Sequence, residues 1–211
     1  SIGSNLQDLF TALPPEYVTW LDKTDVKGKI DLKLGFKGRY DAGKSLNPTL
    51  SFGVKIDKGY IQYNKAPFAA SDIEMDFAAQ LPSMDTKRLN LKLDALDFKL
   101  GPDAVHAYVD VLGMDQPKIN ADISAKVDLA RLDRALGLSF VDLKGQLAAK
   151  IKSSGQYNAE QKLFPKTQGQ LTLRNGYVKT GAYPHAITQI NVEAALQNQS
   201  GDFKGASAVL R

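Results

Sequence analysis

The stretch VKGKIDLKLGFK, residues 26–37, alternates apolar and mostly charged side chains over its whole length. Successive side chains of a β-strand point to opposite faces of its sheet, so this stretch predicts a strand with one apolar and one charged face. Strands with one solvated face are typical of antiparallel sheets. The sequence therefore predicts a mainly β protein with antiparallel strands. The same alternation recurs in residues 50–56, 73–81, 89–93, 96–100, 105–111, 119–127, 141–151, 171–178 and 190–196.

Between the strand patterns at residues 89–93 and 96–100 the alternation changes phase. Apolar residues occupy odd positions up to Leu93 and even positions from Leu96 onward. One extra residue in a strand produces this shift, so we expect a β-bulge near Ala95.

The chain repeats itself at an offset of 117 residues, since Gly28 matches Gly145 and Pro48 matches Pro165. Most matched residues are glycines and prolines, which determine turns and bends, so the repeated property is backbone geometry. We divide the chain into a first unit, 1–127, and a second unit, 128–211, whose C-terminal end falls within a strand pattern. The other matched pairs are Lys27/Lys144, Gly38/Gly155, Tyr40/Tyr157, Ala42/Ala159, Gly59/Gly176, Tyr60/Tyr177, Pro67/Pro184, Ala69/Ala186 and Ile73/Ile190.

Three short stretches have helical rather than alternating spacing. Residues 6–10 and 14–21 predict two amphipathic helices, the second with prolines in its first turn. Residues 128–136 predict a third, with Asp128 as its N-terminal cap and Gly137 at its end. Each unit is therefore expected to begin with a short helical segment that precedes its strands.

No arrangement of side chains points to catalysis. The chain has no cysteine, and His106 and His185 lie in different units. The aspartates are dispersed rather than spaced as a calcium loop, and no nucleophile-elbow pattern occurs. We therefore expect a protein that is not an enzyme and has no cofactor and no metal site.

Residues 38–45 match the phosphate-loop pattern G-x-x-x-x-G-K-[ST]. A phosphate loop needs a helix that starts at its lysine, whereas Pro48 disfavours helical geometry at Asn47. A hairpin loop is the expected structure. The formal net charge of +4 comes from lysines spread along the chain, which indicates a solvated sheet face and no nucleic-acid binding.

The apolar faces of these strands need a cover. The sheet can fold onto a second sheet or onto its helices, which gives a closed core. It can instead curl into a trough that holds another apolar molecule, such as an acyl chain. Residue patterns alone leave both alternatives open.

An ordered succession of a helical segment, strands and glycine or proline turns runs through both units. In the first unit it comprises residues 13–17, 26–28, 38–40, 47–48, 54–60 and 66–67; in the second it runs from Asp128 through Gly145, Pro165, Gly176 and Pro184 to Ile190. This succession resembles the AsmA-like family of bacterial envelope proteins, and it looks most like the large members found in Bacteroidetes.

The resemblance implies a fold, a location and a function. It implies a curved antiparallel sheet, groove-like or taco-like, made of two tandem repeats with short N-terminal helices. Its parent protein would be periplasmic, anchored in the inner membrane by an N-terminal helix that this chain lacks, and implicated in outer-membrane biogenesis and phospholipid transport. The expected partners are lipid acyl chains, the rest of the parent chain and, through the anchor, the membrane. The family has no catalytic residues to transfer.

On this interpretation the inward-facing apolar side chains contact lipid. The competing interpretation is a structural β-repeat module with a closed core and no cargo. Neither the identity of the lipid nor the oligomeric state follows from the sequence. The candidate lipid contacts are Ile30, Leu32, Leu34, Phe36, Leu50, Phe52, Val54, Ile56, Ile73, Met75, Phe77, Leu147, Ile151, Leu171, Leu173, Ile190 and Val192.

Overall fold

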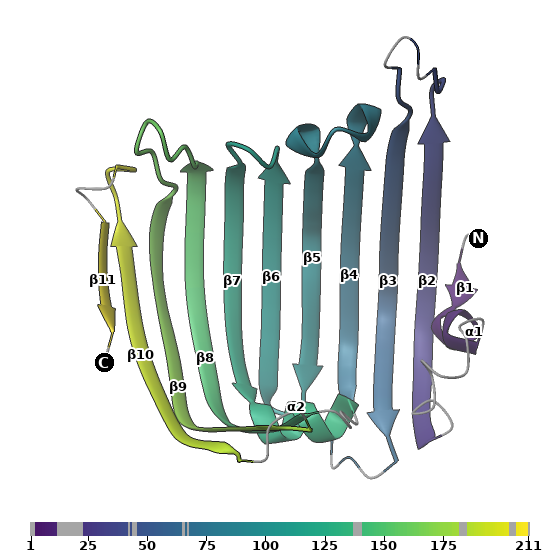
Figure 1. The fold of residues 1–211 in the computed structure, drawn as a ribbon. Coiled ribbons are helices and arrows are strands. Elements are labelled where there is room, and N and C mark those ends of the chain that lie inside the picture. The colour runs from purple at the N-terminus through teal and green to yellow at the C-terminus, as the bar shows by residue number, and fades with distance from the viewer. Residues whose placement is uncertain are drawn as a thin grey trace.

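One antiparallel sheet forms nearly all of the protein. The computed structural model describes residues 3–11, 23–41, 43, 46–64, 66, 68–136, 141–181, 185–202 and 206–210. Its eleven strands lie in chain order from β1 to β11, and each pairs with its sequence neighbour (Figure 1). The predicted mainly β, antiparallel fold is confirmed.

The strands are β1 (Ser4–Asn5), β2 (Thr24–Lys37), β3 (Thr49–Tyr63), β4 (Ala70–Leu81), β5 (Asn90–Leu100), β6 (Asp103–Leu112), β7 (Lys118–Asp128), β8 (Val141–Gln156), β9 (Lys166–Thr180), β10 (Ile187–Asn198) and β11 (Ala206–Leu210). The helices are α1 (Leu6–Thr11) and α2 (Leu129–Leu136), with two short 3-10 turns, η4 (Pro82–Met84) and η5 (Thr86–Arg88), between β4 and β5. Helices α1 and α2 confirm two of the predicted helices, and the stretch 14–21 lies outside the described residues.

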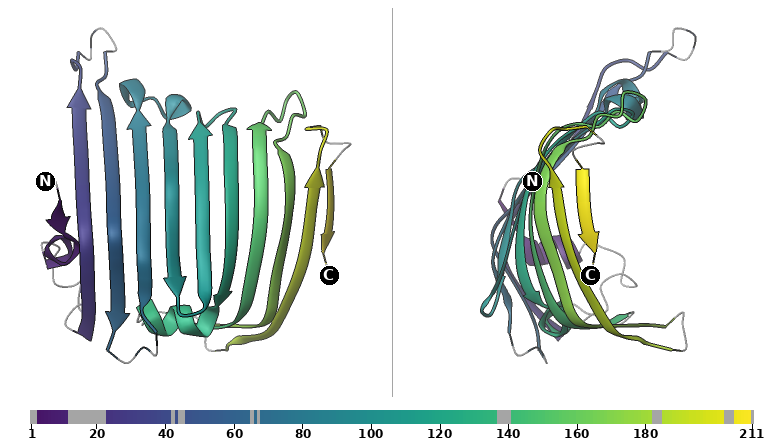
Figure 2. Two further views of the ribbon diagram at one scale, coloured as in Figure 1. Left: turned by 180° about the vertical axis from the view of Figure 1, so that it is seen from behind. Right: turned by 90° about the vertical axis from the view of Figure 1, so that its left-hand side faces the viewer.

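The sheet is curved, and its two helices lie on the concave side (Figures 1 and 2). Leu6 of α1 is buried against Val26 and Ile30. Ala135 of α2 is buried against Leu100 and Val127, at the end of the sheet where β7 finishes. These contacts show that the concave face is the apolar face of the predicted alternation.

The accessible surface shows how open this architecture is. The protein exposes 13836 Å². A folded globular monomer of its mass exposes roughly 9,600 Å². Within the described residues the strands form one layer, with no second sheet against either face. The protein therefore leaves much more surface in contact with water than a closed two-layer sandwich does.

The 117-residue repeat is visible in the backbone. Strands β9 and β10 begin and end 117 residues after β3 and β4. Gly28 and Gly145 share a φ of 124°, and the β2–β3 and β8–β9 registers both shift at these glycines. Lys58 and its counterpart Asn175 both have a φ of 52°. Even so, β7 pairs with β8 along its whole length, so the two units share one continuous sheet.

Two local predictions are also confirmed. The registers of β5 with β4 and β6 shift between Leu93 and Leu96, which is the bulge expected near Ala95. The phosphate-loop pattern lies in the hairpin between β2 and β3, where Asp41 and Leu46 form an isolated antiparallel bridge. Residues 42, 44 and 45 of that loop lie outside the described residues.

Candidate functional site

The candidate lipid contacts lie on the concave face in rows that cross the strands. Residues directly opposite each other in an antiparallel pair share one face of the sheet. One row passes from β2 to β10 through nine neighbouring strands. Its members are Ile30, Ile56, Met75, Leu96, Ala107, Ile123, Ile151, Gly169 and Leu196.

Most of these side chains are neither fully buried nor fully solvated. Leu34 is 79% exposed, Phe36 68% and Phe52 41%. Ile30 differs, because it is buried beneath Leu6 of α1. The other thirteen candidates are half-buried. Four of them pack against clusters that include a helix residue: Leu32, Val54 and Ile56 at Leu6 of α1, and Ile73 at Ala135 of α2. The structure thus brings all seventeen residues to one apolar surface, of which α1 and α2 each cover a part.

Helix α2 closes one end of this surface, and a polar cluster holds the helix in place. Asp128 accepts hydrogen bonds from the backbone N–H of Ala130 and Arg131, so it caps the helix as predicted. The buried carboxylate of Asp103 accepts bonds from the Arg131 guanidinium at 3.2 Å and from the Asp128 N–H at 2.9 Å. Gln146 of β8 donates to Asp128 at 2.8 Å. The Leu143 N–H of β8 donates to Asp133 of α2 at 3.1 Å, so the helix is bonded to β6, β7 and β8.

These bonds also set the charge state of the capping residue. Partial burial of Asp128 acts to raise its pKa, but the hydrogen bonds from Gln146 and from the Arg131 and Ala130 amides outweigh it. The net result is a lowered pKa, so the carboxylate stays ionised to lower pH than in an unfolded chain.

Strands β5, β6 and β7 place further apolar residues on the concave face, beyond the seventeen candidates. Leu93 lies opposite Phe77 on one side and Val109 on the other, and Ile123 lies opposite Ile151. Their alternation was already visible in the sequence. The alternation in residues 89–93 and 119–127 is the sequence signal that places them on the same face as the candidates.

The convex face is polar and carries cross-strand ion pairs. Lys152 lies 2.8 Å from Asp122 and Lys55 lies 3.6 Å from Asp76. The hydrogen bond from Lys152 lowers the pKa of Asp122. Exposed pairs of this kind contribute little to stability, so their main effect is to keep this face solvated.

One histidine on the convex face has a partner that its sequence position did not predict. His106 Nδ1 lies 2.6 Å from Asp97 Oδ1, because the two residues are direct neighbours across β5 and β6. His185 is exposed. Among the described residues, no three His, Cys, Asp or Glu side chains are grouped so that they could hold a metal ion.

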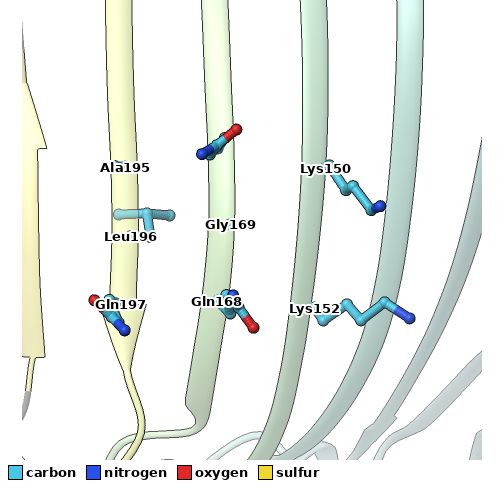
Figure 3. A pocket seen from close by; sticks show the side chains of 8 residues that line it. Lys150, Lys152, Gln168, Gly169, Ala195, Leu196 and Gln197 are labelled. Carbon is cyan, nitrogen blue, oxygen red and sulfur yellow. The ribbon is translucent and has the colours of Figure 1, made fainter.

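A depression also lies on the convex face, over β8, β9 and β10 (Figure 3). Lys150, Lys152 and Gln168 point out from neighbouring strands around it, with Gln170 and Gln197 completing the polar lining. These ammonium and amide groups can form hydrogen bonds with a polar ligand. The lining contains no carboxylate, hydroxyl or imidazole that could act as a base or nucleophile.

No protein-family model, no curated protein and no solved structure matches this chain. Neither helix in the described part of the chain is long and apolar enough to cross a bilayer. The fold and the site define a class by geometry: an open, single-layer antiparallel sheet with an apolar concave face and a charged convex face.

Proposed function

We propose that the concave face binds lipid acyl chains, and that the chain is a non-enzymatic segment of an AsmA-like envelope protein. In this proposal the parent protein is anchored in the inner membrane, and the segment lies in the periplasm. It contributes to outer-membrane biogenesis by carrying phospholipid along an apolar groove.

The observation that carries the proposal is the apolar row that crosses nine strands, of which the described residues cover only the β2 end, where Leu6 of α1 lies over Ile30. Burying apolar surface is worth about 25 cal/mol per Å², whichever molecule provides the cover. Large contiguous apolar patches on soluble proteins usually mark a binding surface. An acyl chain matches this surface, because it is apolar along its length and needs no directed hydrogen bonds.

Native mass spectrometry after expression in bacteria, followed by lipid extraction, tests the proposal. We expect bound phospholipid on the wild-type chain. The variant Leu34→Glu/Phe52→Glu places two carboxylates on exposed concave positions and should lose the lipid while remaining folded. Circular dichroism reports whether it is folded.

The control is Lys33→Glu/Lys55→Glu, which places two carboxylates on the convex face of the same strands. This control changes the net charge more than the concave variant, so an effect of charge alone would be larger in the control. Lipid loss confined to the concave variant supports acyl-chain binding. Equal lipid loss in both variants, or a wild-type chain without lipid, would refute it.

The competing proposal is a structural β-repeat module that carries no cargo. The ion-paired convex face and the repeated backbone fit a spacer equally well. This module predicts a wild-type chain that is free of lipid and concave variants that change only its solubility.

A further inference from the structure

Strand β2 has an exposed edge, whereas the corresponding edge of β8, its counterpart in the second unit, is paired with another strand. Strand β8 pairs with β9 on one side and with β7 on the other, in continuous register from Lys118–Gln156 to Asp128–Gln146. Strand β2 pairs with β3 along its length, but with β1 only at Lys29 and Ile30. Among the described residues, segment 31–37 of β2 therefore has a strand partner on one side only.

Side-chain exposure reports the same difference. Leu34 is 79% exposed, whereas its counterpart Ile151 is half-buried between Ile123 of β7 and Gly169 of β9. Phe36 is 68% exposed, and its counterpart Ser153 is half-buried opposite Ala121. In the part of the chain that the structure describes, neither β2 side chain has a flanking strand on its outer side.

An unpaired strand edge presents backbone N–H and C=O groups that another strand can bond. Lysines often protect such edges, and β2 carries Lys33 and Lys37 there. Strand β8 also carries lysines, Lys150 and Lys152, and is nevertheless paired, with Asp122 of β7 bonded to Lys152. Lysines on the convex face therefore do not prevent pairing in this fold when the partner strand brings a carboxylate.

We propose that segment 31–37 of β2 binds an extended strand of another polypeptide that has the chemistry of β7. The strand runs antiparallel to β2 and adds to the sheet by backbone hydrogen bonds. This inference depends on the repeat and the edge, and it holds whether or not the concave face carries lipid.

The repeat predicts the register and the side chains of this partner. Subtracting the 117-residue offset places the Ile123 position of a β7-like strand opposite Leu34, and the small residue Ala121 opposite Phe36. The Asp122 position falls opposite Gly35, where its carboxylate lies diagonally between Lys33 and Lys37. The partner therefore has a large apolar residue flanked by small ones on the concave side, and an acidic residue on the convex side.

Disulfide trapping tests the proposal, because the chain has no cysteine of its own. The probe is a synthetic peptide of residues 118–128. Chain variant Leu34→Cys should cross-link to the peptide carrying Ile123→Cys, and Lys33→Cys to the peptide carrying Ser124→Cys. Peptides with cysteine at position 119 or 127 should cross-link several-fold less, because the register places them out of reach.

Two controls locate the binding. Chain variant Lys150→Cys lies on β8, which is already paired, and should not cross-link. A peptide with alternate backbone amides methylated keeps its side chains but cannot form the ladder, and should fail to compete. Circular dichroism confirms that each variant is folded.

Three results would overturn the proposal: equal trapping at Lys150→Cys, trapping without register preference, or competition by the methylated peptide. A fourth overturning result would come from size-exclusion chromatography with light scattering on the chain alone. If the chain self-associates and Leu34→Pro abolishes this, the occupant of the edge is a second copy rather than a separate strand.

Discussion

The first and second units have nearly the same backbone but different linings. Gly59 and Gly176 occupy the same bend, and the amides of Lys58 and Asn175 both bond to a side chain of the next strand, at 3.0 and 2.9 Å. On the concave face, however, Phe36, Phe52 and Phe77 of the first unit correspond to Ser153, Gly169 and Ala194 of the second. The repeat therefore preserves the bends. The lining can vary because the described residues place no second sheet over this face that the side chains would have to match.

The largest expected effect concerns the shared bends. Gly28→Ala and Gly145→Ala each place a Cβ 2.8 to 2.9 Å from the Cα of a glycine on the next strand, at a φ of 124°. We expect each to lower the free energy of unfolding by about 3 kcal/mol or more. Urea denaturation measures this, with Gly53→Ala as the control, whose Cβ meets nothing closer than 3.7 Å. If only one of the two substitutions lowers the free energy of unfolding, the bends of the two units are not equivalent.

The second prediction concerns the lining. Phe77 contacts Phe52 edge-on, with ring centroids 6.3 Å apart, and is half-buried. Phe77→Ala should cost about 1.5 kcal/mol, against about 3 to 5 kcal/mol in a closed core. The reverse change at the counterpart, Ala194→Phe, should be tolerated. If Phe77→Ala instead lowers the free energy of unfolding by about 3 to 5 kcal/mol, the face is packed against another layer.

The third prediction concerns how the stability contribution of Asp128, at the start of the second unit, depends on pH. The folded pKa of Asp128 is lowered, so its contribution is fully present above the unfolded pKa of about 3.9 and is lost as pH falls through the folded pKa. Asp128→Asn keeps a capping oxygen but no charge. We expect it to cost up to about 1 kcal/mol at pH 7 and progressively less in acid. Asp57→Asn on the convex face is the matched control. A cost of Asp128→Asn that is independent of pH would contradict this.

The smallest expected effect on stability comes from giving the second unit the lining of the first. Ser153 and Thr167 hydrogen-bond to each other at 2.9 Å, where the first unit has Phe36 and Leu50. We expect Ser153→Phe/Thr167→Leu to change stability by no more than about 0.5 kcal/mol, because the face is open. Binding of a fluorescent apolar dye should rise. Unchanged dye fluorescence would mean that this part of the face is covered.

Much of the local structure could be predicted from particular residues. The phase change at Ala95 indicated the bulge, Asp128 indicated the start of α2, and the paired glycines indicated the shared bends. The seventeen candidates share one face because side-chain direction in a strand follows position alone. The burial of Ile30 by Leu6 could not be predicted, since it depends on where α1 lies rather than on alternation.

The sequence by itself determined the strands, their one-sided apolar character and the repeated bends, because period and backbone preference are properties of neighbouring residues. Only the tertiary structure decided whether the apolar face is covered. The number of layers depends on how far the sheet curves and on where α1 and α2 cross it. Curvature and helix position depend on contacts between residues far apart in the chain. The alternation of apolar and polar residues is the same in a closed core and in an open trough.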